Sequence, residues 1–377
     1  MKLLKIGSLN MPNNRWEDAL NYFDEVYVFS FDTEKDVPNA SFHYLKFDTK
    51  DNFNNFWYRF VRHFSYSKRN HWLCYIGRLI LRVYNHSLLE TIKGTEYTHI
   101  HSSYNDFDDS AFLTFLLSPK TYTRAQKETR LYYSFIEKQA LAKASRVILN
   151  DKLNVDFFQK KYDANLFDGK EVLTGLDEDV RSARVLTKIR YKKKLSEADG
   201  KIHAVILAGR ALSTSSDKRS GGRLYYIPLI NKLLDAGMVV HLHTGNIVPF
   251  VGHNPYEELA AENTNFKIED KLDFMNEPEI AYGTLSRYDI GICHAHIPNS
   301  EVTEFDKVNL PHRYYEYELA HVVPIDVNGG NYLLEKKAAE GHALIYETFN
   351  DVKLSDCKNI KWDTPTFADY IQRLYCV

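Results

Sequence analysis

The sequence predicts an α/β protein with two Rossmann-like domains, each built on a parallel β-sheet. Its 377 residues exceed the roughly 100–200 residues of a typical domain, so two domains are the natural number. Short apolar segments alternate with longer segments of helical periodicity, which is typical of βαβ units and a parallel sheet. The alternation begins again in the second half, after a strongly charged segment at residues 181–199.

In the first half, six short segments have the apolar or β-branched character of strands. They are residues 2–9, 25–31, 42–47, 97–102, 120–123 and 146–149. Apolar residues with helical spacing predict one helix around residues 131–141 and another around residues 155–162. The charged segment that follows has Lys192, Lys193 and Lys194 at its centre. It is interpreted as a solvated linker or an exposed helix, and in either case as a domain boundary.

The second half opens with a strongly apolar strand at residues 202–208, which ends at Gly209 and Arg210. A polar loop and a helix that stops at Gly237 come next, and Pro228 either kinks this helix or lies in its first turn. The pattern predicts four further strands, at residues 239–243, 266–268, 289–293 and 322–327. It predicts one last helix at residues 365–374.

The composition is that of an ordinary soluble protein and limits the classes of function. Charged residues make up 26% of the chain and the formal net charge is −2, which gives no overall signal for nucleic-acid binding. The first apolar stretch, residues 2–9, is too short for a signal peptide, and no stretch reaches the roughly 18 apolar residues of a membrane span. We expect reduced thiols in the cytoplasm, because the four cysteines show neither a CxxC pair nor metal-ligand spacing: Cys74, Cys293, Cys357 and Cys376.

Residues 53–89 combine basic and aromatic side chains and contain no acidic residue. Such a mixture suits the interface of an anionic membrane, and contact with one is one interpretation. A pair of helices whose aromatic residues belong to the core is an equally favoured one. Binding of single-stranded nucleic acid, which uses the same residue types, is the least favoured interpretation.

Several segments, taken in order, resemble the glycosyltransferase-B (GT-B) superfamily, and especially its large retaining family known as glycosyl transferases group 1. In the first half, residues 98–101 (THIH) are similar to the fourth strand of that family, which commonly ends in a His-x-His sequence. Residues 137–148 are similar to the helix and strand that lead to the domain hinge, and residues 172–177 to the crossover segment.

In the second half, residues 206–210 (ILAGR) resemble the family's first strand with its phosphate-binding arginine, and residues 285–292 resemble a later strand entry. Residues 310–325 resemble the Leu-Pro-Asn-Lys … Glu-Tyr … Gly-Pro-Val segment that holds the nucleotide. The chain departs from the family at Val308, where the first glutamate of a spaced pair is usual, and at His321, where glycine is usual.

The resemblance implies two Rossmann-like domains that face a central cleft. The expected boundaries are residues 1–175 for an acceptor domain and 176–364 for a nucleotide-sugar domain, with a helix at 365–377 that packs back on the first. The implied activity is transfer of a sugar from a nucleotide-diphosphate donor to a hydroxyl of a glycan or lipid-linked acceptor, in bacterial surface polysaccharide synthesis. Neither a cofactor nor a metal is expected, and no nucleic acid is an expected partner.

In the second domain the resemblance assigns phosphate binding to Arg210 and ribose binding to Glu316. A leaving diphosphate gains charge, and cations and helix N-terminal N–H groups can stabilise it without a metal. The alternatives are a solvated loop for Arg210 and a helix-dipole contact for Glu316. Further donor-binding candidates follow from their neighbourhood in the sequence: Lys218, Arg219, Gly222, Glu304 and Lys307.

In the first domain, His101 and Asp108 are the candidate catalytic residues. An aspartate near the acceptor hydroxyl can act as a general base, although an aspartate in a turn is more often a helix N-cap. His101 can bind the donor sugar or the acceptor, or can be structural. Arg124 and Lys127 follow the fifth predicted strand and would suit an anionic acceptor.

Two further functions remain open at this point. A nucleotide-sugar 2-epimerase would have the same fold, and a binding or scaffold protein would have lost catalysis along with the missing motif residues. A nucleotide-binding oxidoreductase is disfavoured, because no GxGxxG follows the first strand.

Overall fold

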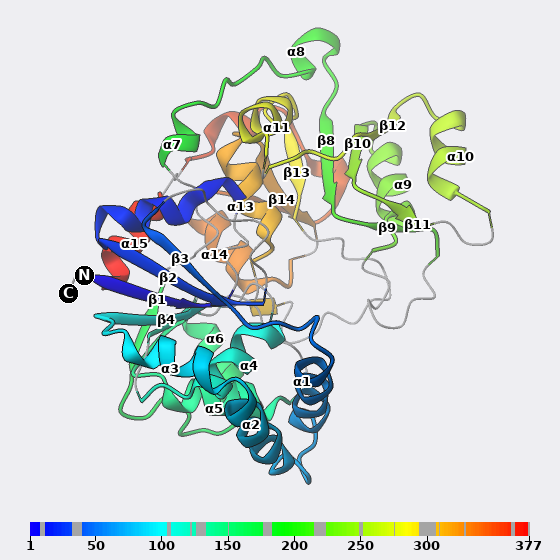
Figure 1. The fold of residues 1–377 in the computed structure, drawn as a ribbon. Helices are drawn as coiled ribbons and strands as arrows, with labels where there is room; N and C mark the ends of the chain where they lie inside the picture. Colours follow the sequence, from blue (N-terminus) through cyan, green and yellow to red (C-terminus); the bar gives the residue numbers. More distant parts are fainter. Residues whose placement is uncertain are drawn as a thin grey trace. The chain divides into compact units, whose positions relative to one another are not determined.

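A computed structural model describes residues 1–7, 12–31, 40–103, 107–120, 123–125, 133–149, 151–175, 183–214, 224–248, 252–274, 276–293, 307–308, 310–327, 329–362 and 366–375. Its contacts divide the chain into two compact units (Figure 1). The first unit is Met1–Ser182 with Thr366–Val377, and the second unit is Ala183–Pro365. The boundaries predicted from the sequence lie after residues 175 and 364.

The first unit contains a seven-stranded parallel sheet in the order β3-β2-β1-β4-β5-β6-β7. Its strands are β1 (Lys2–Ile6), β2 (Glu25–Ser30), β3 (Phe42–Lys46), β4 (His99–Ser103), β5 (Thr123–Ala125), β6 (Arg146–Leu149) and β7 (Glu171–Thr174). Its helices are the 3₁₀ helix η1 (Pro12–Asn21), α1 (Asn52–Ser65), α2 (Leu73–Tyr84), α3 (His86–Gly94), α4 (Phe107–Leu117), α5 (Phe135–Lys143), α6 (Lys152–Lys161) and α15 (Phe367–Tyr375).

Helices cover both faces of this sheet, because alternate residues of its strands are buried on opposite sides. Leu3 and Val26 face η1 and α15, while Leu4 and Phe29 face α1, α2 and α4. Helix α15, from the end of the chain, packs against η1, and Arg146 of β6 donates a hydrogen bond of 2.6 Å to the carbonyl of Leu374. The C-terminal helix is therefore an integral part of the first unit.

The second unit contains a six-stranded parallel sheet in the order β12-β10-β8-β13-β14-β15 and a small two-stranded sheet. Its strands are β8 (His203–Ala208), β9 (Ala211–Leu212), β10 (Val239–Thr244), β11 (Ile247–Val248), β12 (Phe266–Glu269), β13 (Ile290–Ile292), β14 (Val323–Val327) and β15 (Leu344–Tyr346). Its helices are α7 (Ala183–Leu186), α8 (Ser196–Asp199), α9 (Ile227–Asp235), α10 (Pro255–Glu262), α11 (Pro278–Leu285), α13 (His312–Leu319), α14 (Tyr332–Glu340) and the 3₁₀ helices η2 (Phe349–Asp351) and η3 (Asp356–Asn359).

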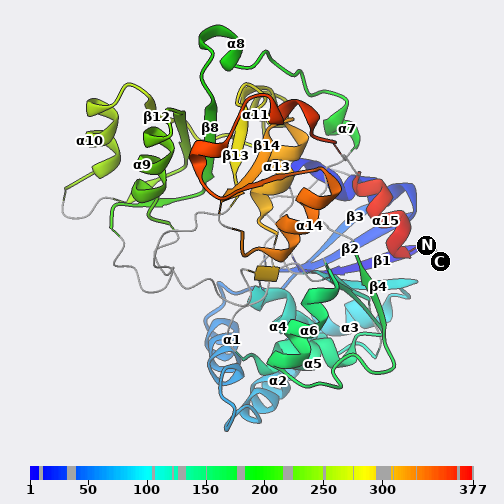
Figure 2. The same ribbon diagram turned by 180° about the vertical axis from the view of Figure 1, so that it is seen from behind.

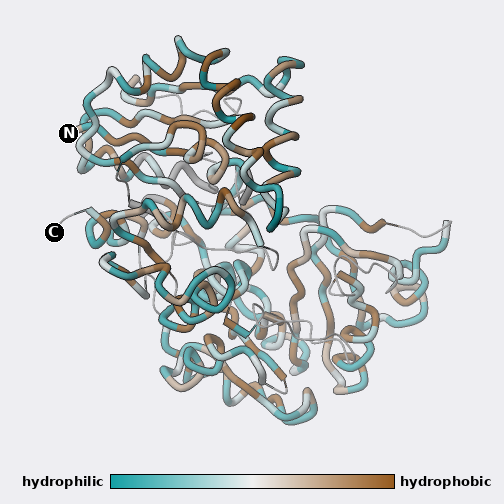
Figure 3. The backbone as a smooth tube through the Cα atoms, turned by 90° about the horizontal axis from the view of Figure 1, so that it is seen from below, coloured by the Kyte–Doolittle hydropathy of each residue, from teal (hydrophilic) through white to brown (hydrophobic). Residues whose placement is uncertain are grey.

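Every strand pair in both large sheets is parallel, so the predicted fold class of two α/β domains with parallel sheets is confirmed. The reverse view shows the same layered arrangement of helices on each sheet (Figure 2). The central strands are hydrophobic along much of their length, and many of the outer turns are hydrophilic (Figure 3). Pro228 lies in the first turn of α9, which settles the choice left open by the sequence. Among the described residues, no helix is long and apolar enough to span a membrane.

Candidate functional site

Each large sheet has a switch point, where the strand order changes direction. It lies between β1 and β4 in the first unit and between β8 and β13 in the second. Ligands of open α/β sheets bind at the carboxyl ends of strands beside such a point. His101 lies on β4, with Lys5 of β1 as its register partner, and Arg210 follows the carboxyl end of β8. The topology therefore places one predicted residue beside the switch point of each sheet.

In the second unit, Tyr317 of α13 occupies the switch point itself. Strand β8 pairs with β13 only as far as Gly291, opposite Val205. Beyond that pair, the hydroxyl of Tyr317 accepts a hydrogen bond of 3.1 Å from the Leu207 N–H and lies 3.3 Å from the carbonyl oxygens of Val205 and Ile292. Tyr317 thus satisfies backbone groups that the diverging strands leave without a ladder partner.

The N-terminus of α13 is rich in basic side chains. Its N-cap is Pro311, which makes no side-chain capping bond, and its first turn holds His312 and Arg313 but no acidic residue. Helices usually have acidic or capping residues at this end, because the helix dipole and the free N–H groups favour negative charge there. Arg313 is hydrogen-bonded to Tyr226, just before α9, and lies near the buried thiol of Cys293, just after β13. A second cation is thereby placed close to the carboxyl ends of β8 and β13.

Sequence reasoning gave Arg313 no role. The signal was present, because Arg313 occupies the lysine position of the Leu-Pro-Asn-Lys segment. What the sequence did not show is that Tyr226 and Cys293, from distant segments, lie against it.

Glu316, predicted to bind ribose, is nearly enclosed, with an exposed fraction of 5%. Its carboxylate accepts a short hydrogen bond from the hydroxyl of Tyr282 on α11 and lies 3.3 Å from Nδ1 of His312. Because the carboxylate is so little exposed, a ribose that binds it has to displace a neighbouring protein group. His312, with a side chain 42% exposed, is the more accessible of the two.

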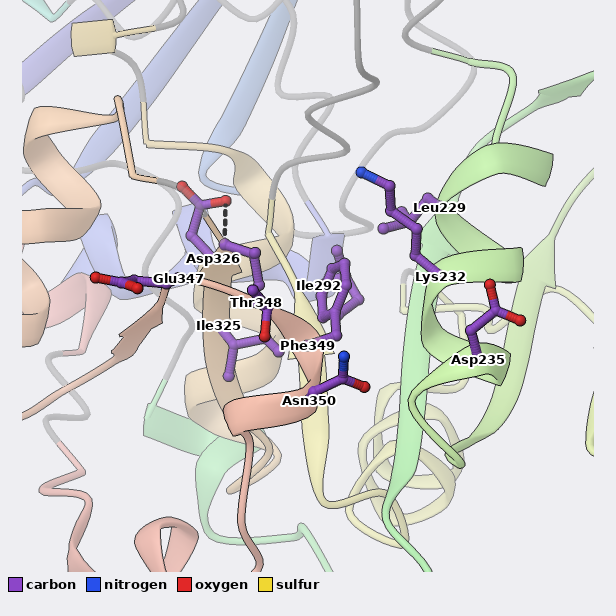
Figure 4. A pocket seen from close by; sticks show the side chains of 11 residues that line it. Leu229, Lys232, Asp235, Ile292, Ile325, Asp326, Glu347, Thr348, Phe349 and Asn350 are labelled. Atoms are coloured by element: carbon purple, nitrogen blue, oxygen red, sulfur yellow. Dashed lines mark hydrogen bonds between the residues drawn. The ribbon is translucent and has the colours of Figure 1, made fainter.

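A pocket of about 340 Å³ opens between α9 and the carboxyl ends of β13 and β14 (Figure 4). Lys232 and Asp235 on α9 form one wall, and Asp326 and Glu347 lie on the opposite side (Figure 4). The volume is at the lower end of the range for small-molecule sites. Its lining residues are Leu229, Lys232, Asp235, Ile292, Ile325, Asp326, Val327, Glu347, Thr348, Phe349 and Asn350.

The pocket and Glu316 lie on opposite faces of the sheet. Ile292 lines the pocket and belongs to the core beneath α9, whereas neighbouring Gly291 carries the ring of Tyr317 on the other face. Alternate residues of a strand point to opposite faces, which separates the two features.

The other predicted donor residues are only partly described. Arg210 is exposed, and Lys307 is partly buried next to the buried Val308. The remaining four lie outside the described residues: Lys218, Arg219, Gly222 and Glu304.

In the first unit, His101 is fully enclosed by Trp16 and Tyr375, with ring centroids 5.9 Å from each. Burial and the neighbouring charge of Lys5 lower the pKa of His101 well below its ordinary value, so the imidazole is neutral at pH 7. Neither ring nitrogen has a hydrogen-bond partner among the described residues, which is rare for a buried polar group. Lys5 is also fully buried, with Nζ 5.2 Å from the Trp16 ring, and was not identified from the sequence.

Asp108 lies in the first turn of α4, and Arg124 lies in β5, but their side chains are not described. Lys127 lies outside the described residues. Asp109, next to Asp108, accepts a hydrogen bond of 2.8 Å from the hydroxyl of Tyr58 on α1. The described residues contain no group of three or more His, Cys, Asp or Glu side chains suited to a metal ion.

The structure of the chain is similar to solved structures of sugar-transferring enzymes. A trehalose-6-phosphate synthase, OtsA, is 11% identical with a TM-score of 0.52, and the match covers 99% of this chain and 93% of that one. A sucrose-phosphate synthase from Thermosynechococcus elongatus is 12% identical with a TM-score of 0.50, covering 100% and 95%. The trehalose-6-phosphate enzyme of E. coli bound with UDP-2-fluoro glucose is 12% identical with a TM-score of 0.50, covering 99% and 91%.

No protein-family model and no curated protein sequence matches the chain. At such low identities a structural match establishes the fold and leaves the activity to be argued from the site. Because each match extends over nearly the whole chain, the protein has the two-domain GT-B fold of these glycosyltransferases.

Proposed function

We propose that the chain transfers a sugar from a nucleotide-diphosphate donor to an acceptor hydroxyl. The observation that carries this proposal is the position of Arg313 in the first turn of α13, beside the switch point of the second sheet. Helix N-termini and arginine side chains bind phosphate groups and stabilise developing negative charge. Among similar structures, one was determined with UDP-2-fluoro glucose bound and another, from Burkholderia xenovorans, with glucose-6-phosphate.

In this proposal the diphosphate leaving group lies against Arg313, Arg210 and the N-terminus of α13. Their positive charge stabilises the departing diphosphate, so the proposal requires no metal ion. Glu316 binds the ribose after displacing His312. The remaining donor contacts are proposed for Lys218, Arg219, Gly222, Glu304 and Lys307.

The first unit is proposed to present the acceptor, a glycan or lipid-linked molecule of bacterial surface polysaccharide synthesis. His101 and Asp108 are proposed to act near the reacting centre, and Arg124 and Lys127 to bind an anionic acceptor. A neutral His101, whose two ring nitrogens have no hydrogen-bond partner within the described part of the chain, is suited to hydrogen-bond a sugar hydroxyl. We place the enzyme in the cytoplasm, with residues 53–89 in contact with an anionic membrane.

The donor site can be tested by thermal unfolding with UDP, GDP, ADP, CMP and their sugar conjugates. A ligand at 100 times its dissociation constant stabilises the folded state by about 2.7 kcal/mol. For a domain of this size that raises the melting temperature by roughly 5–10 °C. We expect one nucleotide family to give such a shift.

Three variants show whether the nucleotide-induced rise in melting temperature depends on Arg313. Arg313→Met should abolish it, and Arg313→Lys should retain part of it, because lysine keeps the charge but lacks the paired N–H donors of arginine. Arg287→Met is the matched control, because Arg287 precedes β13 at the opposite edge of the same sheet. Melting temperatures without ligand show whether each variant is folded.

The outcomes separate the candidate functions. Transfer of labelled sugar to an acceptor supports the transferase, whereas conversion of the donor to its C2 epimer without acceptor supports the epimerase. If no nucleotide shifts the melting temperature at millimolar concentration, the donor-site proposal fails and a binding or scaffold role is favoured.

A further inference from the structure

The outward face of α2 is apolar, the reverse of what an exposed helix normally shows. Trp72, just before the helix, and Ile76, Leu79 and Val83 are spaced to fall on one face, with exposed fractions of 54%, 42%, 65% and 72%. The opposite face is fully used, because a Cβ on Gly77 would lie 2.6 Å from Val61 of α1. The exposed apolar stripe is therefore not an unfilled part of the core.

Helix α1 extends the same surface. Phe53 and Phe56 are exposed by 38% and 61%, and the ring of Phe53 lies 4.2 Å from that of Tyr84 at the end of α2. The structure thus divides the aromatic residues of segment 53–89 between surface and core. The partly buried ones that pack against the core are Trp57, Tyr58 and Phe64.

A cationic hollow of about 480 Å³ lies beside the stripe, between α2 and α3. Arg78, Arg82 and Lys93 contribute to its lining, and Glu90 is its one acidic residue. Burial and the charge of Arg82 lower the pKa of Arg78, and burial together with both arginines lowers the pKa of Lys143 on α5. The Nε of Arg78 is buried without a hydrogen-bond partner among the described residues. This excess of like charge favours an anionic ligand in the hollow.

We propose that α1 and α2 dock on an anionic phospholipid bilayer, with the apolar stripe in the interface and a lipid phosphate in the hollow between α2 and α3. Amphipathic helices lie in the interface with their apolar face roughly 5–10 Å deep, and basic side chains add attraction to anionic lipids. The inference deepens the proposed function and rests on it for the acceptor's location, but lipid binding itself requires no transferase activity.

The residue types favour lipid over other partners of the same surface. The exposed rings of Trp72, Phe53 and Phe56 suit either a bilayer interface or nucleic-acid bases. Ile76, Leu79 and Val83 decide between them, because aliphatic side chains suit acyl chains and do not stack on bases. A second copy of this chain would bring Arg78 and Arg82 close to their own equivalents, and like charges oppose such an association.

The test is co-sedimentation of the full chain with vesicles of phosphatidylcholine alone or with 30% phosphatidylglycerol. We expect binding to the anionic vesicles, weakened by added salt. The double variant Leu79→Glu/Val83→Glu should bind at least about ten-fold more weakly, because two apolar side chains are lost and two repelling charges are gained. Arg82→Gln should weaken binding by about five-fold, and only on anionic vesicles.

Ile280→Glu is the matched control, because Ile280 is an exposed apolar residue (62%) in the second unit. It should bind vesicles like the unmodified chain. No binding to anionic vesicles, or equal binding by the double variant, would overturn the proposal. It would equally be overturned if inorganic phosphate or a single-stranded oligonucleotide bound at Arg82 while vesicles did not.

The nucleotide-induced rise in melting temperature, measured on the same double variant, separates the two proposals. A preserved shift with lost vesicle binding supports both. If no nucleotide raises the melting temperature of the unmodified chain, but vesicle binding depends on Leu79 and Val83, only the donor-site proposal fails.

Discussion

Replacing Gly291 by alanine tests whether Tyr317 holds the second sheet open at its switch point. An alanine Cβ at this position would lie 2.5–2.6 Å from three ring atoms of Tyr317, closer than real Cβ contacts. The ring cannot simply move aside, because Tyr317 is fully buried and its hydroxyl contacts the backbone of Val205, Leu207 and Ile292. Either the strand or helix α13 must shift.

The cost follows from three terms. Overpacking a core costs about 1–3 kcal/mol, and losing two hydrogen bonds of the hydroxyl, one accepted and one donated, costs about 2 kcal/mol. Replacing a strand glycine returns up to about 1 kcal/mol through lower chain entropy. We therefore expect Gly291→Ala to lower the free energy of unfolding of the second unit by about 2–4 kcal/mol. Because α13 also carries Arg313, nucleotide affinity should fall as well.

Urea unfolding measures the first effect and nucleotide titration the second. Gly94→Ala is the control, because a Cβ on Gly94 meets no atom within 4 Å. In a Tyr317→Ala background the added methyl group enters the space of the missing ring, so Gly291→Ala should cost little or even stabilise. A neutral or stabilising effect in the unmodified chain, or an equal cost in both backgrounds, would refute the reasoning.

Three further predictions concern buried groups. Burial lowers the pKa of His241 to about 4, against roughly 6.5 when unfolded, so the unfolded chain takes up a proton first as the pH falls. The free energy of unfolding is therefore constant above pH 6.5 and falls by up to about 3 kcal/mol toward pH 4. His241→Asn should flatten the fall when the urea midpoint is plotted against pH. The ammonium of Lys161 lies 2.9 Å from the fully buried carboxylate of Glu137. Glu137→Gln should therefore lower the free energy of unfolding, measured in urea, by about 3–5 kcal/mol. Glu90→Gln, which breaks an exposed ion pair, should change it little. Burial raises the pKa of Cys74 to about 12, so mass spectrometry should find this thiol unlabelled by a disulfide reagent at pH 8 until the chain is unfolded.

The central strands could be predicted from the sequence because a strand buried on both faces is apolar along its whole length. His203–Ala208 (HAVILA) shows this pattern, and all of its residues but Leu207 are buried. Edge strands lack it. Glu171–Thr174 lies at the end of the first sheet with no buried residue, and its sequence was interpreted as a crossover segment rather than a seventh strand. Its pairing with β6 depends on a neighbour that the local sequence does not specify.

Segment 53–89 shows a second limit of prediction. Helix α2 is apolar nearly all round (LCYIGRLILRVY), so periodicity alone does not reveal which face is covered. That depends on the contact between Gly77 and Val61, two residues on different helices. Arg313 shows the same limit at the donor site, since its position in a known type of segment was visible while its contact with Tyr226 was not.

His321 shows how the chain can depart from a family pattern without losing the underlying geometry. This residue follows α13, where the resembling family has glycine, and its φ of 54° is in the left-handed region that glycine adopts most readily. A residue with a Cβ pays about 1–2 kcal/mol for this conformation. The His321 ring stacks against Tyr191 at 4.2 Å and against Trp362 at 5.0 Å, which offsets that cost.

The backbone at His321 also holds part of the charged segment 181–199 in place. The Nζ of Lys194 donates hydrogen bonds of 2.6 Å to the carbonyl oxygens of His321 and Tyr288, and burial lowers its pKa to about 8. The segment read from the sequence as a solvated linker or exposed helix is therefore fixed here to the end of α13. Since α13 also carries Arg313 and Tyr317, the histidine preserves the helix that supports the proposed phosphate site. The presence of histidine in place of glycine therefore does not indicate that the proposed phosphate site has been lost.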